Sequence, residues 1–278
     1  MRVLSWNLYH GRDFPPDRAL FTLRSRVLRT TERNARHVQV NRPLLDEFGR
    51  VLDGFEWDVA LLQEAPPGWF DELQRRTGAA GARVLTARNL CPPVQGRLAC
   101  WNPDLVASWE GGSNQVLVRR PGRVLELRPL TLARRPERRR MLWTRLELAG
   151  GERLCAANLH ASAHGPGRPD LELVAAAEAA MEWSGADPLL FGGDFNLRPD
   201  RAPEPFAVLR ERFGLGAPTS PDAIDHVLAR GLEPTERPRQ LAPEERELAE
   251  PDGRRLRLSD HRPVVAGFMR YSRAVHER

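Results

Sequence analysis

Short apolar stretches recur along the chain, and most of them end in polar residues. Each is too short for a typical helix and is bounded by Gly, Pro, Asn or Asp, which is the pattern of buried strands. The strands predicted in this way are 3–8, 59–62, 116–118, 124–127, 142–148, 154–159, 189–191, 224–228 and 264–268.

Turn residues between neighbouring strands predict two hairpins. The dipeptide Pro121-Gly122 predicts that 116–118 pairs with 124–127, and the stretch "AGGE" that 142–148 pairs with 154–159.

Apolar residues at spacings of three and four predict helices between some strands. Residues 17–53 are expected to be mostly helical, with two helices separated at Pro43. Further helices are expected from Asp170, the predicted N-cap, and from Glu204, the latter ending at Gly214.

Strands and helices alternate at the ends of the chain, whereas hairpins lie in its middle. This order favours a mixed sheet, or two packed sheets with helices outside, over a parallel barrel. Segments 89–112 and 233–257, rich in proline, are expected to be long loops that are mobile or face substrate. No clear boundary interrupts the chain, so residues 1–278 are expected to form one domain.

Composition adds a charge preference. The 24 prolines and 22 glycines favour many turns over a helical bundle. All 42 basic residues are arginine, the net charge is +5, and the pI is near 9.9. A guanidinium group binds phosphate through two hydrogen bonds, and positive charge favours polyanionic partners such as nucleic acid or phospholipid headgroups. A solvated arginine surface would give the same composition, so charge alone does not choose between these readings.

The three cysteines lack the spacing of a metal site. Cys155 lies in an apolar alternation and is expected in the core, and a Cys91–Cys100 disulfide has no support. The N-terminus lacks the long apolar region of a leader, and no apolar run approaches the ~18 residues of a membrane span. A cytoplasmic protein without stable membrane insertion is therefore expected.

Polar residues that carry chemistry follow the predicted strands. They are Asn7, Glu64, His160, Asp194, Asn196, Asp225, Asp260 and His261. Taken singly, each is an ordinary turn former or core histidine. Taken together, oxygen donors with two imidazoles and no thiolate predict a Mg²⁺ or Mn²⁺ site at one rim of the sheets.

The stretch "GGDFN" shows the pattern best. Gly192 and Gly193 are expected to let the backbone turn close to a substrate. Asp194 and Asn196 are expected on one side of the chain, because side chains in an extended segment alternate with period two.

Six short motifs carry a family resemblance: "SWNLYH", "LLQE", "NLHAS", "GGDFN", "IDHV" and "SDHRPV". Their order, over residues 5–264, resembles the endonuclease/exonuclease/phosphatase family, which includes pancreatic-type deoxyribonucleases, apurinic endonucleases, sphingomyelinases and inositol polyphosphate phosphatases. The resemblance implies a four-layer α/β/β/α sandwich of two mixed β-sheets flanked by helices. It also implies divalent-metal hydrolysis of phosphate esters at one rim.

The resemblance assigns metal binding and water activation to different groups. Glu64 would bind Mg²⁺ or Mn²⁺, with Asn7 and Asp260 as further ligands. Asp194 would orient or deprotonate the attacking water, and Asn196 would donate to a phosphoryl oxygen.

The histidines divide into two groups. Asp225 would hydrogen-bond to His261, whereas His160 resembles the extra histidine of the deoxyribonuclease branch and would stabilise the phosphorane or protonate the leaving group. Which imidazole is base and which is acid stays open. His10 and His164 are expected in loops that could border the cleft, and His226 is expected to be structural.

Two further residues are candidates for phosphate binding. Asn114 resembles an asparagine that precedes a family strand, although an ordinary turn residue fits equally well. Arg140 could clamp a phosphate, with Arg138 and Arg139 as competitors for the role.

The predicted function is hydrolysis of phosphodiester bonds in nucleic acid by a metal-dependent nuclease, expected to be a monomer. Trp101 and Trp109 could stack on bases, or could simply pack under a loop. The alternatives are hydrolysis of a phospholipid or small phosphate ester and, more remotely, a non-catalytic phosphate-binding module.

Overall fold

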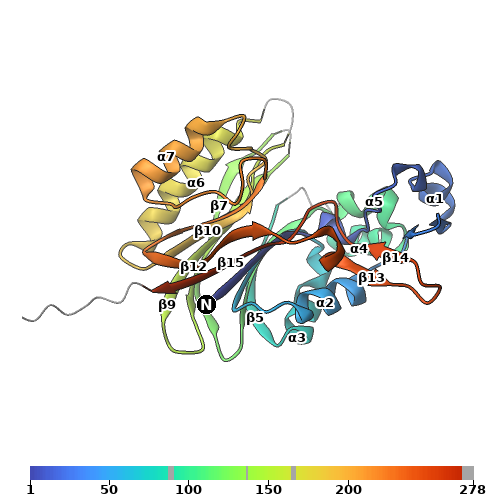
Figure 1. Cartoon of the computed structure of the whole chain (residues 1–278), viewed down its shortest axis with the longest axis horizontal. Helices are drawn as coiled ribbons and strands as arrows, with labels where there is room; N and C mark the ends of the chain where they lie inside the picture. Colours follow the sequence, from blue (N-terminus) through green and yellow to red (C-terminus); the bar gives the residue numbers. More distant parts are fainter. Residues whose placement is uncertain (87–90, 136, 164–166, 271–278) are drawn as a thin grey trace, which may run out of the picture.

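Two β-sheets pack face to face at the centre of the molecule, and helices cover their outer faces (Figure 1). The computed structural model describes residues 1–86, 91–135, 137–163 and 167–270. The six-stranded sheet, in the order β12-β15-β1-β4-β6-β5, contains β1 (Arg2–Asn7), β4 (Val59–Ala65), β5 (Ala79–Leu85), β6 (Ser113–Arg119), β12 (Leu232–Gln240) and β15 (Val264–Arg270). The five-stranded sheet, in the order β11-β10-β9-β8-β7, contains β7 (Arg123–Ala133), β8 (Arg139–Glu147), β9 (Arg153–His160), β10 (Leu189–Asp194) and β11 (Asp225–Arg230).

Apolar residues on alternate sides of the strands build three hydrophobic cores. On β1, Val3 faces the other sheet, whereas Leu4 and Trp6 pack towards α2 (Leu45–Gly54). The outer face of the five-stranded sheet packs on the two helices α6 (Pro169–Ser184) and α7 (Pro203–Phe213). The remaining helix on the six-stranded side is α3 (Phe70–Arg76), which contributes Leu73 to the core. The predicted four-layer α/β/β/α sandwich of mixed sheets is confirmed.

Of the two predicted hairpins, one is confirmed and one is wrong. β8 and β9 pair antiparallel. β6, however, pairs with β4 and β5, whereas β7 pairs only with β8. The turn at Pro121-Gly122 carries the chain from one sheet to the other, which a turn signal alone does not reveal.

The prediction that 17–53 is mostly helical is wrong. Only α1 (Leu23–Leu28) and α2 are α-helices there, and α1 ends at Arg29 in the left-handed region. The remaining elements of residues 8–53 are η1 (Tyr9–Gly11), η2 (Arg18–Leu20), β2 (Glu32–Arg33) and β3 (His37–Gln39). The helical spacing in α1 misleads because its apolar residues are exposed rather than buried.

Neither predicted long loop is a loop. Residues 233–257 contain most of β12, the turn η4 (Pro243–Arg246), and two strands, β13 (Glu247–Ala249) and β14 (Arg255–Arg257), which form a small sheet with β2 and β3. In 89–112, of which 89 and 90 lie outside the described residues, the chain forms α4 (Pro92–Trp101) and α5 (Pro103–Glu110). The prolines that suggested loops lie in the first turn of these helices. A backbone N–H at that position has no acceptor within the helix, so proline, which lacks the N–H, costs no hydrogen bond there.

The two remaining helix predictions differ in outcome. α7 ends at Gly214, which adopts a left-handed conformation with φ +65°, as predicted. Asp170 is not the N-cap of α6, because the helix begins at Pro169 and Asp170 pairs with Arg168 inside the first turn.

Two other expectations concern cysteines and membranes. Cys155 is buried, as predicted, and Cys91 and Cys100 are exposed free thiols. Within the described residues, none of the helices combines the length and the apolar character needed to span a bilayer.

A buried carboxyl group outside the catalytic rim should make stability depend on pH. Asp13 accepts a hydrogen bond from the Val40 N–H at 3.0 Å, and its Oδ1 has no hydrogen-bond partner within the described residues. Burial raises the pKa of Asp13 well above its ordinary value of 3.8, although the Val40 bond opposes the rise and nearby Asp104 adds to it.

We therefore expect Asp13→Asn to gain stability relative to the natural chain as pH rises. The native state holds the Asp13 proton to higher pH than the unfolded state, so the natural chain loses stability between the two pKa values, at about 1.4 kcal/mol per unit of separation. Asparagine keeps a carbonyl acceptor for Val40 and does not titrate. Urea unfolding of both proteins between pH 4 and pH 8 measures the difference, and a difference that is flat with pH would contradict the expectation.

Candidate active site

The strand alternation that builds the core between the sheets continues to one rim, where the side chains become polar. Asn7 follows Val3 on the inner face of β1, and Asp194 follows Leu190 on the inner face of β10. In the strand register, Asp194 is paired with His160 of β9 on one side and with Asp225 of β11 on the other. The sheets therefore bring four of the predicted residues to the same rim, because side chains two positions apart share a face.

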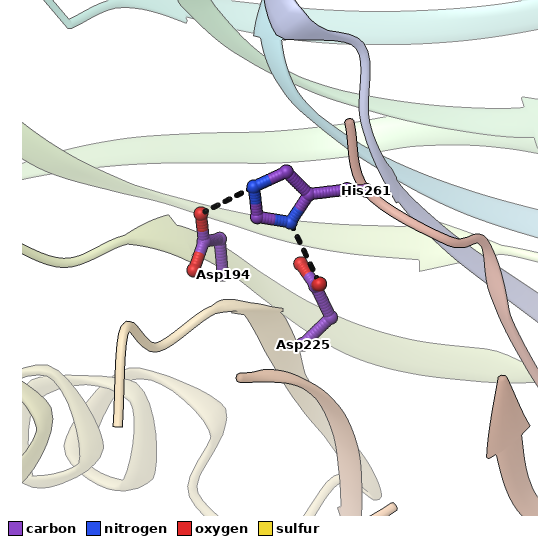
Figure 2. A group of neighbouring side chains, drawn as sticks. All are labelled: Asp194, Asp225 and His261. Carbon is purple, nitrogen blue, oxygen red and sulfur yellow. Dashed lines mark hydrogen bonds and ion pairs between the residues drawn. The ribbon is translucent and has the colours of Figure 1, made fainter. Parts of the chain in front are cut away.

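His261 lies between two aspartates at this rim (Figure 2). Its Nδ1 is 2.8 Å from Asp225 Oδ2, and its Nε2 is 3.8 Å from Asp194 Oδ2. Burial opposes the charge on the ring, but Asp225 and Asp194 outweigh it and raise the pKa of His261 well above 6.5. The predicted Asp225–His261 hydrogen bond is present.

The segment before β15 holds His261 in place through its backbone. Ser259 has φ +58°, and its hydroxyl donates to the Asn7 carbonyl at 2.6 Å and accepts from the His261 N–H at 3.0 Å. The His261 carbonyl accepts from Trp6 Nε1 and from Arg246 Nη1 at 3.1 and 2.6 Å. These contacts fix the imidazole against β1.

Asn7 contacts Asp194 directly. Its Nδ2 donates to Asp194 Oδ2 at 3.0 Å, and its Oδ1 accepts from the Tyr9 N–H at 2.9 Å. Asp194 Oδ1 accepts from the Asn196 N–H at 3.0 Å. Burial raises the pKa of Asp194 to about 7, against the opposing effect of His261. Asn7 here orients Asp194, and direct ligation of a metal by Asn7 stays a prediction.

Glu64 occupies an irregular point of β4. The pairing of β4 with β6 shifts between Leu62 and Ala65, and Glu64 has φ +46°. A β-bulge of this kind re-aims a side chain. A Cβ at Gly112 would lie 3.0 Å from the Glu64 Cα, so a larger residue there would require the backbone at Glu64 to shift by a few tenths of an ångström.

Histidines surround the Glu64 carboxylate. His10 Nε2 and His160 Nδ1 lie 3.3 and 3.7 Å from its oxygens. Burial would raise the pKa of Glu64, but the surrounding imidazoles and Arg139 lower it to about 2. Burial also lowers the pKa of His160, with Arg139, to about 3, so His160 is neutral at pH 7. The positive charge near Glu64 then comes from His261 and Arg139.

Strained backbone gathers at this rim. Within the described residues, six residues other than glycine have positive φ, and five of them belong to the site or its flanking turns: Tyr9, His10, Glu64, Asn196 and Ser259. Such conformations cost of order 1–3 kcal/mol each and cluster at functional sites.

The two glycines of "GGDFN" serve packing rather than a turn. β10 continues through both of them to Asp194. A Cβ at Gly193, where φ is +130°, would lie 2.0 Å from the Leu159 carbonyl oxygen, and one at Gly192 would lie 2.7 Å from the His226 carbonyl oxygen. The expectation of a turn is wrong, because the glycines let the neighbouring strands approach β10.

Asn196 does not continue the strand beside Asp194. With φ +52°, it lies outside the extended conformation that would put both side chains on one side. Its Nδ2 donates to the Ala161 carbonyl at 3.0 Å. A contact of Asn196 with a phosphoryl oxygen stays a prediction.

Of the three competing arginines, Arg139 makes the contact with a catalytic candidate. Its Nη1 lies 3.0 Å from His160 Nδ1. The Arg140 carbonyl accepts from Asn114 Nδ2 at 2.7 Å, which links these two predicted residues through the backbone. Arg140 Nε is buried with no hydrogen-bond partner in the part of the chain that the structure describes, and burial lowers its pKa.

Asp260 is next to His261 and partly exposed. Its Oδ1 lies 3.8 Å from His261 Nε2, and burial raises its pKa, with Glu64 adding to the rise. The carboxylates of Glu64, Asp194 and Asp260 thus influence one another.

Two donor sets at the rim have the chemistry of a divalent-cation site. Donor atoms of Asp194, Asp225 and His261 lie within 4.8 Å of one another, but His261 and Asp225 already satisfy each other by a hydrogen bond. Within the described residues, Glu64 has no arginine ion pair, and both imidazoles beside it have lowered pKa values. An ionised carboxylate without an arginine partner in the part of the chain that the structure describes, near a second carboxylate at Asp260, fits an oxygen-binding divalent metal.

Three contributors were not among the predicted site residues. His10 and Arg139 were considered only as a bordering and a competing residue, and Ser259 was not considered although it lies in "SDHRPV". His10 was detectable, since it lies in "SWNLYH" three positions after Asn7. His164 lies outside the described residues, and His226 is buried with its Nδ1 accepting from the Thr219 N–H at 3.2 Å, as expected of a structural residue.

The fold and this rim define a phosphoester hydrolase of the two-sheet sandwich class. The model of the Endonuclease/Exonuclease/phosphatase family matches residues 4–261, so the chain belongs to that family, whose members hydrolyse phosphoester bonds and generally depend on divalent metals. Comparison with curated protein sequences gives no match.

Solved structures show the same fold at low identity. A mannosyl-6-phosphatase from Bacteroides thetaiotaomicron is 14% identical, with TM-score 0.62, over 97% of this chain and 99% of that one. The human Nocturnin catalytic domain with bound sulfate is 16% identical, with TM-score 0.62, over 97% and 94%. TDP2 of D. rerio complexed with a single-strand DNA product is 15% identical, with TM-score 0.56, over 97% and 98%.

Proposed function

We propose that this chain is a divalent-metal-dependent phosphodiesterase and that nucleic acid is its first candidate substrate. The observation that supports this most strongly is His261, held by Asp225 at 2.8 Å and facing Asp194, beside the ionised Glu64. Hydrolysis of a phosphate ester requires an aimed water, neutralisation of phosphoryl charge and a proton for the leaving oxygen.

Glu64 and Asp260 would hold the metal, which stays a proposal as to both ligands and ion. When bound, Mg²⁺ or Mn²⁺ would neutralise charge on the phosphoryl oxygens. Asp194, fixed by Asn7 and by its own turn, would orient the attacking water and take its proton.

The imidazoles and amides would act on the phosphoryl group. His261, with its tautomer fixed by Asp225, would donate to a phosphoryl oxygen from Nε2. Neutral His160 would donate a hydrogen bond to the phosphorane or to the leaving oxygen. Asn196, Asn114 and Arg140 remain candidates for phosphate contacts, and Arg139 joins them because it reaches His160.

The substrate is the finer part of the proposal. The net charge of +5, in a chain whose basic residues are all arginine, supports nucleic acid as the substrate. A structural neighbour is complexed with a DNA product. Another neighbour is a mannosyl-6-phosphatase, so the fold hosts several substrates. A phospholipid or a small phosphate ester is therefore the second candidate.

Chelation tests the proposal. With bis(para-nitrophenyl) phosphate as a soluble diester, EDTA should abolish turnover, and Mg²⁺ or Mn²⁺ in excess should restore it. Turnover that survives exhaustive chelation contradicts metal dependence, and no turnover with any divalent ion or ester favours the non-catalytic alternative. Single-stranded DNA, duplex DNA, RNA and phosphoinositides as competitors then rank the substrate classes.

A further inference from the structure

The three helices α1, α4 and α5 lie at one end of the molecule (Figure 1), and exposed apolar side chains gather on them. Of the twelve exposed large hydrophobic residues within the described part of the chain, eight lie on α1, α4 and α5, so they are not scattered single residues. We call this set the apolar face: Leu23, Val27, Leu28, Val94, Leu98, Trp101, Leu105 and Trp109. Leu23 is 77% exposed and Trp109 is 68% exposed. A monomeric protein rarely exposes such a patch without a binding role.

A buried polar network joins the three helices into one unit. Asn102, at the junction of α4 and α5, donates to the Arg26 carbonyl of α1 at 2.7 Å. Asn41 donates to the Ser25 carbonyl at 2.9 Å and to Asn102 Oδ1 at 2.8 Å. The apolar residues of α1 are therefore held in a fixed relation to those of α4 and α5.

Exposed arginines lie among and beside the residues of the apolar face. Residues 18–31 include four exposed arginines and no acidic residue: Arg18, Arg24, Arg26 and Arg29. Residues 91–110 include one exposed charge, Arg97, whereas their two acidic residues, Asp104 and Glu110, are buried. Apolar side chains with exposed arginines among them, although Asp17 and Asp71 are exposed at the borders, match an anionic apolar interface.

The helices that carry the apolar face pack against a segment of the catalytic rim. α5 packs against η1, which follows directly on β1 and carries His10. A small cavity between them is lined by His10 and Gly11 on one side and by Cys100, Ala107 and Glu110 on the other. The helices that carry the apolar face therefore lie near Glu64, because His10 contacts the Glu64 carboxylate.

We propose that the apolar face docks on the surface of an anionic phospholipid bilayer and brings lipid-borne phosphoesters to the rim. Six of its eight residues are aliphatic, and aliphatic side chains partition among acyl chains but cannot stack on bases. The two tryptophans suit the headgroup level of a bilayer, where aromatic side chains concentrate. Hydrolysis of lipid-borne esters rests on the phosphodiesterase activity proposed above and takes its second substrate candidate, whereas the docking itself does not depend on that activity.

Vesicle flotation without substrate tests the docking. The full chain should bind phosphatidylcholine vesicles that contain phosphatidylglycerol, and should bind pure phosphatidylcholine less. The double variant Leu28→Ser/Trp109→Ser should bind about tenfold more weakly or worse, because two exposed anchors are lost. Leu127→Ser/Leu171→Ser, which changes two leucines elsewhere that are also more than half exposed, should bind like the natural chain.

Arginine variants separate anchoring by apolar side chains from electrostatic attraction to the anionic headgroups. Arg24→Gln/Arg97→Gln should weaken binding to anionic vesicles only, and the control Arg237→Gln on β12 should not. The proposal is overturned if the natural chain does not float with anionic vesicles. It is also overturned if Leu127→Ser/Leu171→Ser loses as much vesicle binding as Leu28→Ser/Trp109→Ser. Lack of flotation together with single-stranded DNA binding that Leu28→Ser/Trp109→Ser removes also overturns it and assigns the face to nucleic acid.

Hydrolysis of the soluble diester distinguishes failure of the docking proposal from failure of the proposed function. None of these variants touches the rim, so all should hydrolyse bis(para-nitrophenyl) phosphate at the natural rate, while only Leu28→Ser/Trp109→Ser and Arg24→Gln/Arg97→Gln lose turnover of phosphodiesters in vesicles. Flotation without any hydrolysis means that the proposed function fails and the docking stands. Hydrolysis without flotation means the reverse.

Discussion

His261→Gln is expected to lower kcat on a soluble phosphodiester by about 100- to 1,000-fold, the range for the loss of a preorganised donor to developing negative charge. The imidazole contacts Asp225 at 2.8 Å and also faces Asp194 and Asp260 at 3.8 Å. Glutamine keeps polarity and approximate length but cannot carry the proton. Because the metal ligands are unchanged, the metal concentration at half-maximal activity should stay within a few-fold.

The same experiment includes a graded and a matched variant. Asp225→Asn removes the charge that holds Nδ1, so kcat should fall less than in His261→Gln while the pH profile shifts. His37→Gln is the control, since His37 also pairs with a carboxylate, Glu247 at 3.3 Å, but lies in the small sheet. Full activity of His261→Gln, or equal loss in His37→Gln, would exclude the assigned role.

The sequence predicted those parts of the fold in which the residues of the apolar pattern are also the residues that are buried. β8 and β9 were predictable because apolar alternation and the turn between them agree. β6 and β7 show the limit, since the same signals flank a turn between two different sheets. α1 was overextended because its apolar spacing serves an exposed surface, which a linear pattern cannot distinguish from a core.

The candidate site was predictable in its membership but not in its contacts. Asn7 and Asp194 were found from strand ends, yet their hydrogen bond at 3.0 Å depends on two sheets meeting over 187 residues of sequence separation. Arg139 rather than Arg140 reaches His160, because the start of β8 and the end of β9 set which guanidinium arrives there. Glu64 was identified, whereas its bulge and its positive φ are tertiary features without a local signal.

The bulge at Glu64 leads to the second large expected effect. Glu64→Gln should raise the Mg²⁺ concentration needed for half-maximal activity by about 10- to 100-fold or more, because a neutral amide replaces the carboxylate nearest His10. Calorimetric titration of Mg²⁺ measures the same loss without substrate. Glu56→Gln, whose carboxylate pairs with Arg2 on the surface, is the control and should bind metal normally. If Glu64→Gln binds Mg²⁺ with unchanged affinity, Glu64 is not a ligand and the metal site would be the set of Asp194, Asp225 and His261.

Glu64→Gly separates function from stability at the same position. Glycine adopts φ +46° freely, so the strain of about 1–2 kcal/mol in a left-handed residue should be relieved. The variant should therefore be inactive while its free energy of unfolding is equal to or higher than that of the natural chain. If it instead unfolds more easily, the carboxylate contributes to the fold through His10 and His160, and the strain at Glu64 is not a cost retained for metal binding.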